Sequence, residues 1–142
     1  MNKAVSGFTL IEIVVVIVIV GILAAFAYPR FASMDAEARK AAVEALSRSV
    51  RDATARARSQ ALARGGPATI TMEGQTITMH NGYPNEASID NTLQDYTGFQ
   101  FINAVEAKFR RLDAPAPSTC MVTYADAVAG APPVIAVFTT CC

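Results

Sequence analysis

The feature that most constrains this chain is an apolar stretch near its N-terminus. Nearly every residue from 8 to 27 is apolar. About 20 such residues are enough to cross the hydrocarbon core of a bilayer as a helix. A small domain could hardly surround a helix that is apolar on every side. The stretch therefore predicts a helix that lies outside any soluble core.

Glu12 conflicts with this environment, because it lies inside the apolar stretch. An ionised carboxylate in hydrocarbon costs a few kcal/mol or more, so acids in membrane segments are generally paired. The sequence shows no partner nearby. In a membrane-bound monomer the side chain can snorkel to the interface near the helix end. Otherwise the partner has to come from elsewhere.

A secretory signal peptide is the main alternative interpretation of the apolar stretch. Ala25-Phe26-Ala27 imitates the A-x-A cleavage site of such peptides. Against this stand Glu12 inside the would-be apolar region and a leader with a single lysine, Lys3. The helical pattern also continues straight through the supposed cleavage point. We therefore interpret the stretch as a retained helix, with the signal peptide as the second interpretation.

An amphipathic helical pattern follows the apolar stretch. Between residues 36 and 62 apolar residues recur at steps of three and four, and charged residues fill the other faces. The apolar stripe consists of Ala42, Leu46, Val50, Ala53, Ala57 and Ala61. Gly65-Gly66-Pro67 predicts the end of the helix. Pro29 predicts a kink, because proline lacks an N–H and crowds the preceding turn.

The remaining sequence predicts a small antiparallel sheet. The tetrapeptide TITM occurs at residues 69–72 and again at 76–79, around Glu73-Gly74-Gln75, which is typical of a β-hairpin. Other segments predict a turn at 81–84, a short helix at 88–95, a strand or an anchoring loop at 99–102, and two strands around 127–133. The expected fold class is α+β, with a long N-terminal helix packed on an antiparallel sheet of about four strands.

Three cysteines, Cys120, Cys141 and Cys142, lie in the last quarter of the chain. They lack the paired CxxC spacing of a zinc site, so a disulfide in an oxidising compartment is the favoured interpretation. A symmetric hairpin about residues 130 and 131 brings Cys120 opposite Cys141, and this pair is expected to form the bridge. Cys142 is the alternative partner, one residue out of register and facing the other side of the strand.

Composition and motifs argue against several function classes. The net charge is zero and only 17% of residues are charged, so no nucleic-acid partner is expected. No GxSxG, P-loop or metal-ligand spacing occurs. The sole histidine, His80, lies beside a predicted turn without the nucleophile and orienting group that a triad requires. We therefore expect no enzyme activity, no cofactor and no metal site.

Two polar clusters contain residue types that also occur in binding sites. Asp90, Asn91 and Asp95 offer the oxygen ligands that calcium prefers, but a polar helix face is the favoured interpretation. A basic cluster at 108–111, with Lys108, Arg110 and Arg111, is small enough to be simply solvated. Neither cluster changes the expected function.

Residues 7–12, GFTLIE, follow a short leader with one lysine. Together with the apolar run and Pro29, this motif resembles the class III signal of type IV pilins and of the pseudopilins of type II secretion. The resemblance implies that a prepilin peptidase cleaves after Gly7 and methylates the new amine of Phe8. It also implies that Glu12 pairs with the terminal amine of a neighbouring subunit in a filament of packed helices, which removes the penalty of an unpaired buried acid.

Within this family, the segments at 27–31 and 35–39, with the NGYP of residues 81–84 and the strand beginning at Cys120, look like pilins of the mannose-sensitive haemagglutinin type. This implies a structural subunit that polymerises through its N-terminal helix into a surface filament for adhesion. A pseudopilin of a type II secretion system is the alternative.

The resemblance also implies partners, locations and a division of the chain. The partners are copies of itself, the prepilin peptidase, the pilus assembly machinery and, before assembly, the inner membrane. The precursor would lie in the inner membrane and the subunit later in an extracellular pilus, or in a periplasmic pseudopilus in the alternative. The expected parts are a removed leader at 1–7, a transmembrane and assembly helix at 8–28, the amphipathic half of the helix at 29–64 and a globular head at 65–142.

Overall fold

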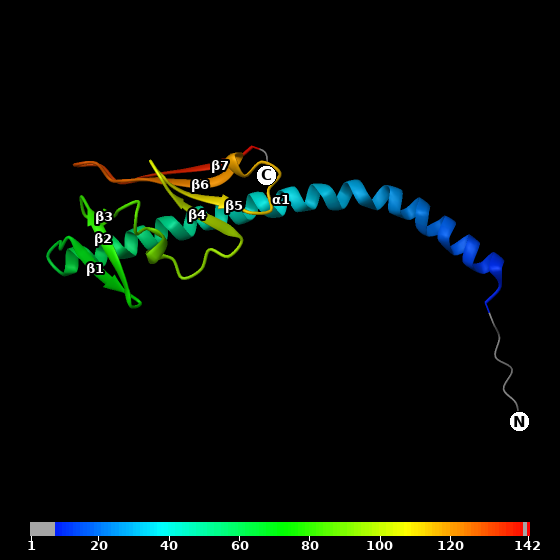
Figure 1. The fold of residues 1–142 in the computed structure, drawn as a ribbon, viewed down its shortest axis with the longest axis horizontal. Helices are drawn as coiled ribbons and strands as arrows, with labels where there is room; N and C mark the ends of the chain where they lie inside the picture. The colour runs from blue at the N-terminus through cyan, green and yellow to red at the C-terminus, as the bar shows by residue number, and fades with distance from the viewer. Residues whose placement is uncertain (1–7, 141) are drawn as a thin grey trace, which may run out of the picture. The chain divides into compact units, whose positions relative to one another are not determined.

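One long helix, α1, dominates the first half of the chain (Figure 1). The computed structural model describes residues 8–140 and residue 142, and the chain divides into two units, residues 1–36 and 37–142. Helix α1, Leu10–Ala63, has 54 residues and contributes to both units. Pro29 lies inside α1 without ending it, and the kink expected there stays a prediction.

The described residues after α1 form seven strands and two short 3-10 helices. The strands are β1 Thr69–Met72, β2 Gln75–His80, β3 Tyr83–Pro84, β4 Phe99–Asn103, β5 Ala107–Arg111, β6 Cys120–Ala125 and β7 Val134–Thr139. The 3-10 helices are η1, Asp90–Thr92, within the segment expected to be a short helix, and η2, Pro117–Thr119. The α+β class predicted from the sequence is confirmed.

The strands form two antiparallel sheets, whereas a single sheet of about four strands was expected. One sheet has the order β1-β2-β3 and the other the order β4-β5-β6-β7. Strand β5 was not predicted, because its sequence AKFRR looks like a basic surface cluster. In the sheet, Ala107 and Phe109 are buried, and the charged residues between and after them are half-buried.

Two glycine-containing turns set the register of the first sheet. Met72 pairs with Gln75, so the loop between β1 and β2 is the two residues Glu73 and Gly74 rather than the three expected. Both have positive φ, as a type I′ hairpin turn requires. Asn81 and Gly82 repeat this geometry between β2 and β3, at the segment predicted to be a turn.

The end of α1 is defined by two glycines, as the sequence indicates. The amide of Gly66 donates to the carbonyl of Ala61 at 2.8 Å, and the amide of Gly65 donates to the carbonyl of Leu62 at 3.1 Å. Both glycines have positive φ. This is the Schellman arrangement, which satisfies carbonyl groups that the last helical turn would otherwise leave unpaired.

The apolar stripe of α1 forms the core of residues 37–142. Val43, Leu46 and Val50 pack into one cluster with Phe109, Val122 and other residues of the four-stranded sheet. Ala57 and Ala61 pack into a second cluster with Ile70 and Ile77 of the β1-β2 hairpin. Five of the six predicted stripe residues are buried; Ala42 is half-buried and the neighbouring Val43 is fully buried instead.

Contacts between β3 and the end of β6 connect the two sheets. The fully buried Tyr124 of β6 donates its hydroxyl to the carbonyl of Pro84 in β3 at 2.6 Å. Beside it, Asp126 accepts from the amide of Glu86 at 2.6 Å, and Glu86 accepts from the amide of Asp126 at 3.1 Å. Burial, and then the charge of Asp126, raise the pKa of Tyr124 well above its ordinary value.

Tyr124→Phe should destabilise the globular part, residues 37–142, because the buried carbonyl of Pro84 loses its hydrogen-bond donor. The expected loss in the free energy of unfolding is about 1–3 kcal/mol.

The raised pKa of Tyr124 leads to a second prediction. The stability that the neutral Tyr124 contributes is fully present below the unfolded-state pKa of 10.0 and falls as the pH rises further. Thermal unfolding of the purified full chain between pH 7 and 11 should show a shallower alkaline decline in the variant. Tyr96→Phe, at a half-buried ring beside Phe109, is the control; an equal loss there would contradict a specific role of Tyr124.

Candidate functional site

The first half of α1 exposes almost all of its apolar side chains. Val14 is 44% exposed and Leu23 is 62% exposed, and the apolar residues between them fall within this range. Among the described residues, one helix is long and apolar enough to cross a membrane, and none of its most apolar window is buried. This surface therefore lacks a covering within the described part of its own chain.

Glu12 lies in the first turn of α1, and its carboxylate has a local partner that the sequence analysis missed. The backbone amide of Thr9 donates to Glu12 Oε2 at 3.0 Å, and the Thr9 hydroxyl donates to the same oxygen at 2.7 Å. In return, the amide of Glu12 donates to Thr9 Oγ1 at 3.4 Å. This is a capping box, and the pattern Thr9-x-x-Glu12 before an apolar run is its sequence signal.

The expectation that Glu12 has no partner nearby was therefore wrong, but the capping box does not neutralise its charge. Both Thr9 donors are uncharged and both bind Oε2. Within the described residues, Oε1 receives no hydrogen bond and Glu12 has no ion-pair partner. Hydrogen bonding orients the carboxylate, and one oxygen stays available to a cation. The Thr9 amide and hydroxyl thus hold one carboxylate oxygen and leave the other open.

The processing residues lie at the border of the described chain. Gly7 lies outside the described residues, so its predicted cleavage stays a prediction. Phe8 precedes α1 and is 80% exposed. Phe8 and Glu12 are four residues apart at the start of the helix, and within the described chain no other predicted site residue lies in this segment.

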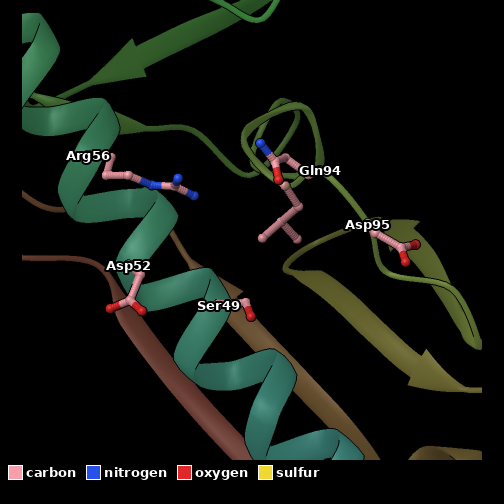
Figure 2. A pocket seen from close by; sticks show the side chains of 6 residues that line it. Ser49, Asp52, Arg56, Gln94 and Asp95 are labelled. Carbon is pink, nitrogen blue, oxygen red and sulfur yellow. The ribbon is translucent and has the colours of Figure 1, made fainter.

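The globular part has a polar pocket between α1 and the loop after η1, with a volume of about 460 Å³. Figure 2 shows Ser49, Asp52 and Arg56 on α1, with Gln94 and Asp95 on the loop. The carboxylate of Asp95 already accepts from the amide and the hydroxyl of Thr97, and these bonds lower its pKa. The pocket thus mixes opposite charges, and its described lining holds no pair of groups arranged for acid–base chemistry.

Two of the three residues considered for calcium are held by other partners. Asn91 donates to the carbonyl of Thr76 at 3.2 Å, and Asp95 is engaged by Thr97. The described residues contain no cluster of three or more acidic, histidine or cysteine side chains able to hold a metal ion. His80 lies at the end of β2, exposed, with Nδ1 3.2 Å from Asp126 Oδ2. That aspartate is already engaged by Glu86, so the pair is part of the contacts between the sheets.

The predicted basic cluster is divided by the strand on which it lies. Lys108 and Arg110 flank the buried Phe109 on β5. Arg111 is engaged by Asp113, with Nε 2.6 Å from Oδ1 and Nη2 3.2 Å from Oδ2, and this pairing lowers the pKa of Asp113. A cluster that is already partly neutralised forms no continuous basic surface.

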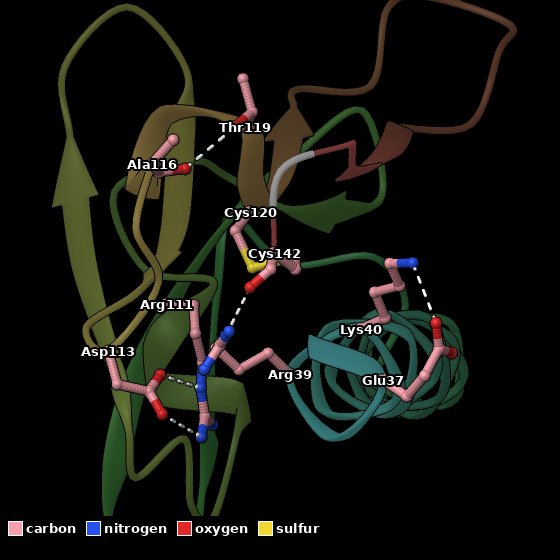
Figure 3. Close-up of a disulfide and its surroundings, with 9 residues drawn as sticks. All are labelled: Glu37, Arg39, Lys40, Arg111, Asp113, Ala116, Thr119, Cys120 and Cys142. Carbon is pink, nitrogen blue, oxygen red and sulfur yellow. Dashed lines mark hydrogen bonds and ion pairs between the residues drawn. A yellow bond between two sulfur atoms is a disulfide. The ribbon is translucent and has the colours of Figure 1, made fainter. Parts of the chain in front are cut away.

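The disulfide joins Cys120 to Cys142, with Cα atoms 5.0 Å apart (Figure 3). The favoured Cys120–Cys141 pairing was therefore wrong, and the alternative is the observed bridge. The β6–β7 ladder places Cys120 opposite Thr139, and β7 ends there. Beyond the ladder the alternation of strand faces no longer applies, so Cys142 can turn back to Cys120. Cys141 itself lies outside the described residues.

The bridge lies beside the globular half of α1. Arg39 on α1 donates its Nε to the carbonyl oxygen of Cys142, as Figure 3 shows. Cys120 belongs to the main apolar cluster together with Val43 and Leu46 of the helix. The disulfide and Arg39 therefore attach the end of the chain to both the sheet and the helix.

Comparison with known proteins gives two matches. The family model for the prokaryotic N-terminal methylation motif matches residues 2–28. The chain is also 53% identical over 56 residues to the type IV narrow pilus major component PilA5 of Thermus thermophilus. This match covers 39% of the chain and 48% of the relative, so the chain spans about half the length of the curated relative it matches. No solved structure matches the chain significantly.

Both findings agree with the resemblance to type IV pilins that the GFTLIE motif and the apolar helix indicate. The particular relative is a narrow-pilus major component. Neither comparison supports the mannose-sensitive haemagglutinin subgroup, which stays a prediction.

Cys142→Ser and Cys120→Ser should each lower the stability of the globular part by about 3 kcal/mol, because the bridge no longer restricts the unfolded chain. The end of β7 should also become more sensitive to proteolysis. Peptide mapping without reduction should find the Cys120–Cys142 link in the wild type. Cys141→Ser is the control and should keep that link. A wild-type chain in which Cys120 is a free thiol would contradict the assignment.

Proposed function

We propose that this protein is a structural subunit of a type IV pilus, which polymerises through the N-terminal half of α1. The observation that carries the proposal is the exposed apolar surface of α1 with a single carboxylate at its start. Apolar burial contributes roughly 25 cal/mol per Å², so this surface favours lipid, or the helices of other subunits, over water. The methylation motif and the pilus component to which the chain is similar support the same proposal.

Glu12 would control the register of assembly. After cleavage behind Gly7, the new amine of Phe8 carries a positive charge at the start of the apolar helix. Glu12 Oε1 has no donor among the described residues, so it can accept that amine from a neighbouring subunit. A subunit inserted out of register would leave both charges unpaired in an apolar core, at a cost of several kcal/mol. The inserted subunit then favours the one axial position, relative to its neighbour, at which the two charges meet.

The proposal includes the sequence of locations. The precursor would lie in the inner membrane, where a prepilin peptidase removes residues 1–7 and methylates Phe8. The assembly machinery would then transfer the subunit into an extracellular filament. A role in adhesion rests on the resemblance of residues 27–31, 35–39 and 81–84, and of the strand beginning at Cys120, to pilins of the mannose-sensitive haemagglutinin type.

Gly7→Leu or Gly7→Glu should block processing, because a side chain at that position keeps the peptidase from approaching the scissile backbone. Full-length precursor should accumulate in the inner membrane, and sheared surface fractions should lack the protein. N-terminal sequencing and mass measurement test this directly. The wild-type mature protein should begin at methylated Phe8. A wild-type protein that begins at Tyr28 would instead support the signal-peptide interpretation.

Glu12→Ala should leave processing and membrane levels unchanged and abolish or thin the filaments. Immunoblots of membranes and electron microscopy of sheared fibres measure the two effects separately. Thr9→Val is the matched control: it removes the hydroxyl of the capping box but keeps the acid and its bond from the backbone amide of residue 9, so its filaments should persist.

Mixed expression tests whether the pairing is between subunits. The alanine variant still offers an amine but no acceptor, so it should enter wild-type fibres poorly. Normal fibre abundance from Glu12→Ala protein alone would contradict the register role. Loss of fibres in Thr9→Val but not in Glu12→Ala would show that helix capping, not charge pairing, governs assembly.

A further inference from the structure

The globular part has a groove between α1 and the start of β7. Two adjoining hollows of about 450 and 310 Å³ share Arg58, Tyr83 and Pro132. We call the combined feature the arginine groove, and its principal lining residues are Arg51, Arg58, Tyr83, Pro132, Pro133 and Ile135. Its walls are an aromatic ring, two prolines and an aliphatic side chain, with two guanidinium groups beside them.

The two arginines of the groove have no acidic partner within the described residues. Arg51 Nη2 donates to the carbonyl of Ile135 at 3.2 Å, and the Arg58 guanidinium lies 4.2 Å from the centre of the Tyr83 ring. These contacts hold both groups in place without neutralising them. In the part of the chain that the structure describes, no carboxylate lines either hollow. The groove therefore fits a ligand with an apolar knob next to a negative charge.

The turn between β4 and β5 has this chemistry. Val105 at its tip is 88% exposed, so its apolar side chain is open to contact by another molecule. Glu106 follows directly, and it has no ion-pair partner among the described residues. The register of the hairpin, with Asn103 opposite Ala107, leaves only residues 104–106 in the turn, so the exposed Val105 and the half-buried Glu106 lie side by side in it.

We propose that Val105 and Glu106 of one subunit dock in the arginine groove of a second copy of this chain. We assign the partner by chemical complementarity, because this turn has the apolar and acidic groups that the groove fits. A second copy of the chain is therefore sufficient to fill the groove. Val105 would contact Tyr83 and the prolines, and Glu106 would pair with Arg58. This inference rests on the proposed filament function and names a contact between the globular parts of its subunits.

The topology agrees with this assignment. The four-stranded sheet has the order β4-β5-β6-β7, so the turn belongs to one edge of the sheet and the groove adjoins the opposite edge. Two different patches on opposite edges form a heterologous contact, which repeats from subunit to subunit and produces rings or open helical polymers. A contact of this small size would be insufficient alone, but the packed helices hold the subunits at high effective concentration.

Site-specific photocrosslinking tests the contact directly. A benzophenone amino acid replaces Val105 in the full chain, and sheared filaments are irradiated. Dimer-sized products should form, and peptide mapping should place the crosslinks at residues 51–59, 83 or 131–135. The same probe at the exposed Leu112 is the control and should not label the groove. Crosslinks from position 105 exclusively to other surfaces, or none in intact filaments, would overturn the proposal.

A charge exchange tests the ion pair. Glu106→Arg and Arg58→Glu should each lower the yield of sheared filaments several-fold, with normal membrane levels and an intact Cys120–Cys142 bridge. The double variant should recover most of the yield. Arg64→Glu, at an exposed arginine outside the groove, is the matched control: alone it should assemble normally, and it should not rescue Glu106→Arg.

The outcomes separate this inference from the proposed function. Absence of filaments from the wild-type protein would refute the filament function. Normal wild-type filaments together with normal filaments from Glu106→Arg, or failure of the double variant to recover, would overturn the docking contact and leave the filament function standing.

Discussion

The first half of α1 has no covering within the described part of its own chain, and the rest of the structure depends on this constraint. Its apolar side chains remain about half exposed. Such a surface favours a membrane or other copies of the same helix over water. Because the surface is uniform along the helix, it gives little preference for one axial position over another. A single carboxylate at Glu12, oriented by Thr9, supplies the discrimination that apolar contacts lack.

The second half of the same helix differs from the first, because its apolar stripe is buried by its own chain. Larger residues of the stripe, such as Leu46 and Val50, contact the four-stranded sheet. Small residues, Ala57 and Ala61, allow the β1-β2 hairpin to approach closely. One helix thus has an exposed apolar first half and a second half around which residues 37–142 pack. The change from a uniformly apolar sequence to an amphipathic one marks the boundary between the two halves.

The two kinds of contact proposed for the filament have different physical roles. Helix packing supplies apolar burial, which is large and non-directional. The turn at residues 104–106 and the arginine groove would add a small contact that depends on direction, since they belong to opposite edges of one sheet. The disulfide and Tyr124 matter for this geometry, because the disulfide joins the start of β6 to the residues after the edge strand β7, and Tyr124 joins the two sheets.

Local rules allowed much of this structure to be predicted from the sequence. Hydrophobic periodicity predicted α1, paired glycines its end, and the repeated TITM the first hairpin, because each signal acts over a few residues. The Thr9-x-x-Glu12 capping box also has a local sequence signal, but the sequence analysis did not predict it. Tertiary structure decided the rest. The β6–β7 ladder ends where Cys120 pairs with Thr139, and beyond it the chain brings Cys142 to Cys120. Strand β5 exists because β4 and β6 pair on both its sides and bury Phe109. Strand register and burial depend on long-range contacts, which no local pattern contains.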